Sequence, residues 1–82
     1  MRLNLYFYRD NNDNVCEMYN RDNVLHDAVR KAVDGKELWE VRILPNNPAN
    51  AAKVVAHCDK MEEAIEVLEQ LADGIFPMPM EQ

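Results

Sequence analysis

The sequence predicts an α+β fold of order ββαββα, in which an antiparallel-rich, four-stranded sheet carries both helices on one face. Three observations predict it. Segments with alternating apolar residues occur in two pairs, each pair precedes a segment with helical apolar spacing, and each helical segment ends at one of the two glycines. With 82 residues we expect one domain at 1–76, followed by an extended Pro/Met tail at 77–82.

The first half of the chain begins with "RLNLYFY" at 2–8, whose alternation is typical of a strand. The cluster "RDNNDN" at 9–14 is typical of a turn, and "VCEMY" at 15–19 would return as a second strand. Asp22 is a suitable N-cap for a helix over 23–33 that Gly35 would end. The apolar residues of this helix would share one face: Val24, Leu25, Ala28, Val29 and Ala32.

The second half predicts the same order. "ELWEVRIL" at 37–44 is a strand pattern with Trp39 in the core, and "AKVVAHC" at 52–58 is the return strand after the loop "PNNPAN". Asp59 and Glu62 have the spacing of a capping box, which begins a helix that runs to about residue 72 and stops at Gly74. Ile75 and Phe76 would cover an edge of the core.

The two halves also match in sequence, because "AVDG" at 32–35 and "LADG" at 71–74 are separated by 39 positions. At this offset, the apolar positions of the two predicted helices coincide. The match predicts a duplicated ββα unit, in which neither half could bury its apolar face alone. The alternative is coincidence between two short helices that end in Asp-Gly.

The net charge of −6 argues against direct binding of nucleic acid or an anionic membrane and favours basic partners. No apolar run has the length of a signal peptide or a membrane span, so we expect a cytoplasmic protein with both cysteines reduced. We also expect no cofactor.

The strongest local signal is an acidic row on the second predicted helix. Glu62, Glu66, Glu69 and Asp73 fall on one side of it, beside the apolar arc, and no lysine or arginine lies within residues 61–74. We interpret the row as a docking surface for a basic protein. The simpler interpretation is a solvated face that keeps the protein soluble, and arginines of the sheet could also neutralise it.

Tyr6 and Tyr8 share the strand face opposite the apolar residues, so they would lie on the open side of the sheet and could contact a partner. We therefore predict a non-catalytic regulator or inhibitor that docks on a nucleic-acid-binding complex. Its most specific form is a phage-encoded mimic of nucleic acid, with Asp10, Asp13, Glu17 or Glu40 extending the charge pattern. The alternatives are an antitoxin-like partner of a small toxin and a homodimeric structural or RNA-binding sheet.

Catalysis and metal binding are not predicted. His57 and Cys58 are adjacent in a strand and would point to opposite faces, so they could not bind one ion together. A nucleophilic pair would need Cys16 beside His57 or His26, which no motif specifies. Both glycines are assigned to helix ends, so the sequence provides no glycine-rich phosphate loop.

Overall fold

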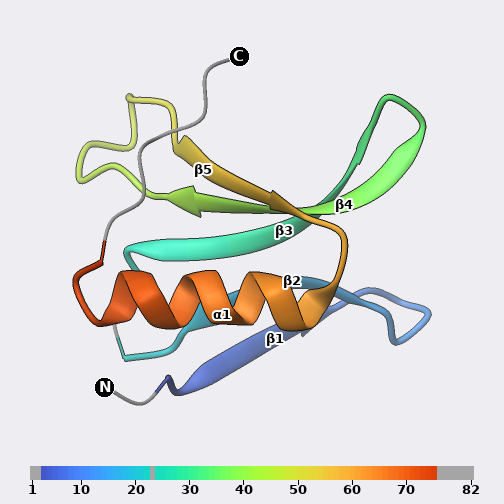
Figure 1. Ribbon diagram of the computed structural model, residues 1–82, viewed down its shortest axis with the longest axis horizontal. Coiled ribbons are helices and arrows are strands. Elements are labelled where there is room, and N and C mark those ends of the chain that lie inside the picture. Colours follow the sequence, from blue (N-terminus) through green and yellow to red (C-terminus); the bar gives the residue numbers. More distant parts are fainter. Residues whose placement is uncertain (1–2, 23, 76–82) are drawn as a thin grey trace.

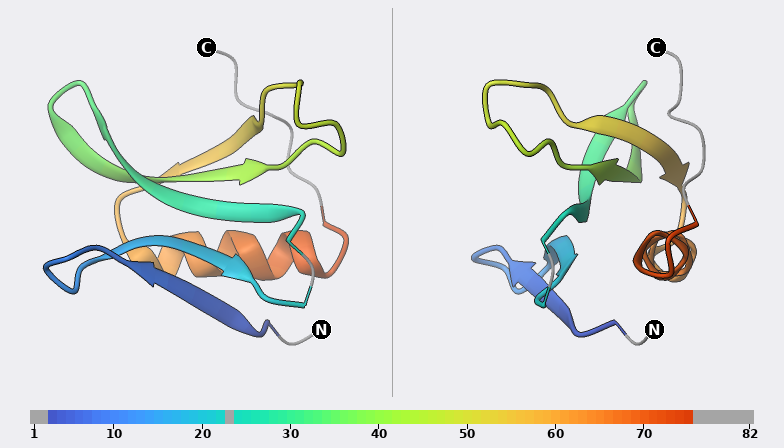
Figure 2. Two further views of the ribbon diagram at one scale, coloured as in Figure 1. Left: turned by 180° about the vertical axis from the view of Figure 1, so that it is seen from behind. Right: turned by 90° about the vertical axis from the view of Figure 1, so that its left-hand side faces the viewer.

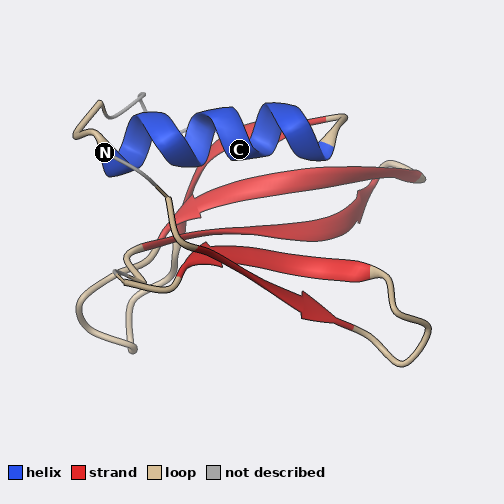
Figure 3. Ribbon diagram, turned by 90° about the horizontal axis from the view of Figure 1, so that it is seen from below, coloured by secondary structure: helices blue, strands red, loops and turns tan. Residues whose placement is uncertain are grey.

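A computed structural model describes residues 3–22 and 24–75 of the chain. These residues form five strands and one helix: β1 (Leu5–Arg9), β2 (Val15–Asn20), β3 (His26–Val33), β4 (Lys36–Ile43), β5 (Lys53–Cys58) and α1 (Met61–Ala72). The strands form one sheet in the order β1-β2-β3-β4-β5, each antiparallel to its neighbours (Figure 1). The helix returns across one face of this sheet (Figure 3).

The helix predicted over 23–33 is wrong. Residues 26–33 form β3, and every residue of this strand pairs with β4, from His26 opposite Ile43 to Val33 opposite Lys36. The fold is therefore not a ββαββα arrangement with four strands and two helices. In the described part of the chain it is a five-stranded antiparallel sheet with a single helix.

The turn between β3 and β4 explains the error. Asp34 and Gly35 both have positive φ angles, 53° and 79°, which is the mark of a two-residue type I′ hairpin turn. Asp-Gly is a preferred sequence for this turn. The glycine that we interpreted as a helix end instead reverses the chain between two strands.

The predicted duplication is wrong for the same reason, because residues 28–32 lie in a strand and their counterparts at 67–71 lie in α1. The Asp-Gly pairs also differ in conformation. Asp34 has a φ of 53°, whereas Asp73, the C-cap of α1, has a φ of −85°. The sequence match is a coincidence between a hairpin turn and a helix end.

The strands predicted at 15–19, 37–44 and 52–58 are confirmed as β2, β4 and β5. The predicted turn at 9–14 is confirmed as well. The Asp10 carboxylate accepts hydrogen bonds from the backbone N–H groups of Asn12 and Asn14, at 2.9 and 3.0 Å. These bonds, the one from Asn14 first, lower the pKa of Asp10.

The core lies between α1 and the sheet face towards it. Met18, Ala28 and Val41 lie opposite one another in neighbouring strands and have no exposed surface. The buried side chains of α1 belong to the same cluster: Ala64, Leu68 and Leu71. Viewed end-on, α1 lies in the concave side of the curved sheet (Figure 2). The predicted core position of Trp39 is confirmed, since its side chain is buried opposite Cys58.

The two ends of the helix differ from their predicted contacts. Lys60, not Asp59, is the N-cap and makes no side-chain capping bond, so the predicted capping box is wrong. The Asp59 carboxylate instead lies 3.0 Å from the Lys36 ammonium group. After the helix, Ile75 is exposed rather than covering the core. Phe76 and the predicted tail at 77–82 lie outside the described residues.

Candidate functional site

Helix α1 presents the predicted acidic row to solvent. Glu62, Glu66 and Glu69 are all exposed, and so is Asp73 at the C-cap position. The helix forms here because apolar residues recur at helical spacing and cover the sheet, while Glu62 and Glu63 in the first turn are favourable at the positive end of the helix dipole. The row therefore stands on an element fixed by the core.

The row points further from the core than the sequence predicted. The fully buried positions, Ala64, Leu68 and Leu71, define the line along which α1 contacts the sheet. At 100° per residue this line falls on nearly the opposite side of the helix from Glu66 and Glu69. The acidic row is thus on the outward side of α1, not beside the buried arc.

Five basic side chains of the sheet and its loops pair with carboxylates outside the row. The pairs are Arg9–Asp13, Arg30–Glu37, Lys31–Glu40, Lys36–Asp59 and Arg42–Asp27. Within residues 3–22 and 24–75, no lysine or arginine nitrogen forms an ion pair with Glu62, Glu66 or Glu69. Asp73 takes part in an interaction within the protein. The unshielded part of the row is therefore these three glutamates.

This arrangement opposes helix stability. Glu62 and Glu66 are four residues apart and Glu66 and Glu69 are three apart, so like charges face each other about one turn apart. Glu69 also lies near the negative end of the helix dipole, and the last turn contains no basic residue. Within the described residues, no ion pair with Glu62, Glu66 or Glu69 offsets this loss of helix stability.

Tyr6 and Tyr8 lie on the sheet face that α1 does not cover, as predicted from their alternation with Phe7. Tyr6 packs beside Tyr19, with ring centroids 5.1 Å apart, and the Arg21 guanidinium lies 4.9 Å from the Tyr6 ring centroid. Tyr8 is the more exposed ring, at 56%. The sequence did not predict that Tyr6 would be engaged by Tyr19 and Arg21.

The structure does not bring the tyrosines and the acidic row together. The helix lies against one face of the sheet (Figure 3). The strand register places Tyr6 and Tyr8 on the other face, because Phe7 between them packs against the core. A single flat partner surface cannot contact both. The two sets are separate candidate surfaces. Glu62, Glu66 and Glu69 are the acids of the row that form no ion pair within residues 3–22 and 24–75.

An ionic network on the uncovered sheet face was missed at the sequence level. Asp27 is only 2% exposed, and its carboxylate accepts two hydrogen bonds from the Arg42 guanidinium. Beside it, the Glu40 carboxylate lies 2.8 Å from the Lys31 ammonium group and 3.3 Å from the His57 ring. Interpreting 23–33 as a helix placed Asp27 and Lys31 on an exposed surface. The alternation of Glu40 and Arg42 with the apolar residues of β4 was the available signal.

Glu40 in this network and Glu17 beside it have shifted pKa values. Burial opposes ionisation of Glu40, but hydrogen bonds from Lys31 and His57 outweigh it, so the pKa of Glu40 is lowered. Burial, together with the charge of Asp27, raises the pKa of Glu17. The pairing of β3 with β4 brings these side chains together, and their own hydrogen bonds and ion pairs keep them in place.

The cysteines and histidines considered as chemical groups are kept apart. Cys16 lies on the helix side of β2 and its thiol donates to the carbonyl of Asn14 at 3.3 Å, whereas His57 lies on the opposite face against Glu40. Cys58 is buried, and burial raises the pKa of its thiol. In the part of the chain that the structure describes, histidine, cysteine and carboxylate side chains form no group of three that could hold a metal ion.

No family model, curated protein or solved structure matches this chain. Among the described residues, no helix has the length and apolar character needed to cross a membrane.

Proposed function

We propose that the protein is a non-catalytic binding module whose acidic helix docks on a basic surface of a nucleic-acid-binding protein or complex. One observation carries the proposal: Glu62, Glu66 and Glu69 are exposed and form no ion pair within the described residues, although the sheet pairs most of its own carboxylates. The three carboxylates repel one another and reduce helix stability. Basic side chains of a partner would offset this repulsion in the complex.

The geometry of the row suits such a partner. Neighbouring glutamates are about 5–6 Å apart at Cβ, so arginine side chains of a partner can each reach one carboxylate and bond it bidentately. The row is fixed by the packing of α1, which limits the entropy lost on association. The summed negative charge accelerates encounter with a basic surface.

Mimicry of nucleic acid is the more specific form of this proposal, and the structure gives it little extra support. Duplex DNA carries one charge per about 1.7 Å of its axis, much denser than the row. Three of the four acids considered as extensions are engaged elsewhere: Asp10 in its turn, Asp13 with Arg9, and Glu40 in the buried network. The fourth, Glu17, is partly buried near Asp27. We therefore favour an inhibitor or regulator that contacts a few basic side chains, and a phage origin is compatible with that role.

The proposal is tested with a variant that neutralises only the unshielded glutamates, E62Q/E66Q/E69Q. The matched control, D13N/E37Q/D59N, removes the same charge from exposed positions of loops and strands. We expect the first variant to lose association with a short oligoarginine peptide and with basic proteins captured from a lysate, whereas the control retains both. The salt dependence of the association rate should flatten only in the first variant.

Equal losses in both variants would show that net charge, not the row, governs binding and would contradict the proposal. Unchanged binding by E62Q/E66Q/E69Q would contradict it as well. Tight binding of the unmodified protein to an oligonucleotide at low salt would assign the molecule to nucleic-acid binding instead.

A further inference from the structure

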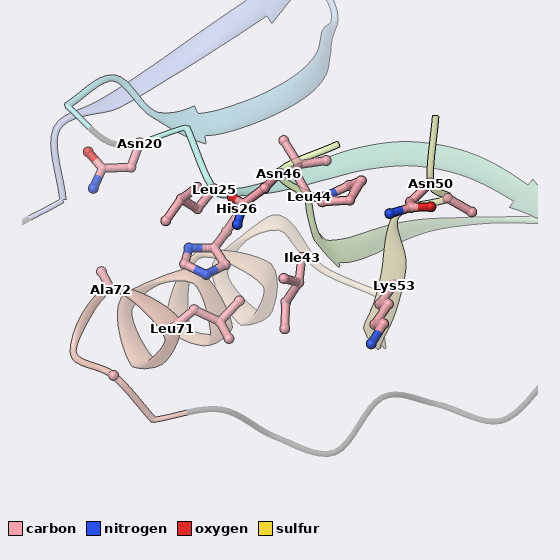
Figure 4. Close-up of a pocket in the computed structure, with 13 residues that line it drawn as sticks. Asn20, Leu25, His26, Ile43, Leu44, Asn46, Asn50, Lys53, Leu71 and Ala72 are labelled. Carbon is pink, nitrogen blue, oxygen red and sulfur yellow. The ribbon is translucent and has the colours of Figure 1, made fainter. Parts of the chain in front are cut away.

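A cavity of about 630 Å³ opens where the last turn of α1, the start of β3 and the β4–β5 loop meet (Figure 4). This volume lies within the range of small-molecule sites. Apolar side chains from three parts of the chain line it, among them Leu25 just before β3, Ile43 of β4 and Leu71 of α1. A hydrogen bond of 2.7 Å from the N–H of Leu44 to the carbonyl of Leu25 joins two of its walls.

The charge of the cavity is opposite to that of the protein. The chain has 15 acidic and 9 basic residues, yet the described residues lining this cavity include no aspartate or glutamate. Lys53 is the one lysine among them, and it forms no ion pair within the described chain. Asn46 and Asn50 add amide groups from the loop. The polar part of the lining is therefore suited to an anion.

The remaining titratable group of the lining does not change this charge. His26 is 9% exposed, and burial lowers its pKa, which favours the neutral form of its ring. Asn50 and Lys53 lie on one side of the cavity, and Ala72 lies on the other (Figure 4). The helix end beside Ala72 carries the negative end of the helix dipole, which disfavours an anion there.

We propose that this cavity binds a small amphipathic anion, whose apolar body contacts Leu25 and Leu71 and whose carboxylate or similar head group pairs with Lys53. Asn50 lies on the same side of the cavity as Lys53, so its amide can donate a hydrogen bond to the same head group (Figure 4). The orientation follows from charge, since the lysine and the helix end lie on opposite sides. This site is independent of the acidic row, which lies on the outward side of α1.

Octanoate, octanol and octylamine test the proposal, because they share the same alkyl body and differ in head group. Each is titrated into the full chain and followed by backbone amide NMR shifts. We expect octanoate to bind about tenfold more tightly than octanol, with shifts at Leu25, Leu71 and Lys53. Octylamine should bind most weakly. Equal affinities, or shifts confined to other residues, would overturn the proposal.

Two lysine variants separate the site from general charge effects. K53M keeps an apolar stem and should weaken octanoate binding about tenfold while leaving octanol affinity unchanged. K60M removes the same charge at the far end of α1 and should leave both affinities unchanged. A third variant, L25Q, alters an already exposed wall residue and should weaken octanoate and octanol alike. Equal effects of K60M and K53M would contradict the site.

Discussion

Asp27 and Arg42 lie opposite each other in β3 and β4, on the sheet face that α1 leaves uncovered, and form a two-bond ion pair. The bond from Arg42 Nε to Asp27 Oδ1 is 2.8 Å long. The Asp27 side chain is 4% exposed, so neighbouring groups largely exclude water from it. The pair holds the register of β3 against β4 through side chains as well as backbone bonds.

Removal of one partner should therefore be costly. We expect D27A to lower the free energy of unfolding by about 3 kcal/mol, because it leaves the Arg42 guanidinium without its carboxylate in a largely buried setting. The matched control is E37A, which removes an exposed pair with Arg30 across the same two strands and should cost less than about 1 kcal/mol. Urea unfolding of both variants measures the difference. Equal losses would show that the Asp27 pair adds nothing beyond a surface pair.

Removal of the Glu17 charge should stabilise the protein, whereas removal of Asp27 should destabilise it. The pKa of Glu17 is raised by burial and by the charge of Asp27, so its ionised form is unfavourable in the fold. An acid with a raised folded pKa stabilises the fold when protonated and loses that contribution as pH rises through the folded value. E17Q should therefore unfold at higher urea concentration than the unmodified protein at pH 7, by about 0.2–1 kcal/mol. Below the ordinary value of 4.5 the two should converge. A lower stability of E17Q at pH 7 would contradict this.

The contribution of Glu40 to stability should be lost at low pH. Its pKa is lowered by Lys31 and His57 despite burial, so its contribution is present above the ordinary value of 4.5 and is lost as pH falls through the folded value. E40Q should cost about 1–3 kcal/mol at pH 7. The difference between E40Q and the unmodified protein should shrink as urea unfolding is repeated at progressively lower pH. A difference that stays constant into strong acid would show that the carboxylate is not responsible.

Most of the fold could be predicted from local sequence, and β3 shows where this fails. β4 and α1 each show one clear period, two residues in "ELWEVRI" and about 3.6 in "MEEAIEVLEQLA". Residues 26–33 fit both periods, because Ala28 and Val29 are small apolar neighbours that satisfy either pattern. Only strand pairing on both sides, which is tertiary information, selects the strand.

The candidate sites were predictable to different degrees. Exposure of Glu62, Glu66 and Glu69 follows from helical period alone, so the sequence was sufficient. The pairing of Asp27 with Arg42, and the cavity near Lys53, depend on which strands are neighbours. The helix predicted over 23–33 took the place of β3, which pairs with both β2 and β4. Without this central strand, the neighbours of Asp27 and Arg42 could not be predicted.

The Asp34–Gly35 turn offers a direct test of the corrected topology. G35A should destabilise the protein by about 1 kcal/mol, since a side chain is strained at a φ of 79° even though the surrounding space is open. D34N should be neutral or stabilising, because asparagine is favoured where φ is positive in a type I′ turn. Thermal unfolding measures both. Strong destabilisation by D34N would show that the turn depends on the Asp34 carboxylate and not only on a residue that tolerates positive φ.

The acidic row should show a conflict between stability and binding that solubility alone does not explain. E69Q removes a like charge near Glu66 and a negative charge at the unfavourable end of the helix dipole. We expect it to raise the free energy of unfolding by about 0.5 kcal/mol while slowing association with a basic partner. E62Q removes a charge that the first turn favours, so it should lower stability slightly and slow association as well.

The pair of variants is informative because the two stability effects have opposite signs and the two binding effects share one sign. Urea unfolding gives the first quantity, and stopped-flow association with an oligoarginine peptide at low salt gives the second. If the glutamates only solvated the helix, association would not change in either variant, and solubility would fall in both. If association followed stability, E62Q alone would bind more slowly, and the role of the row as a docking surface would be contradicted.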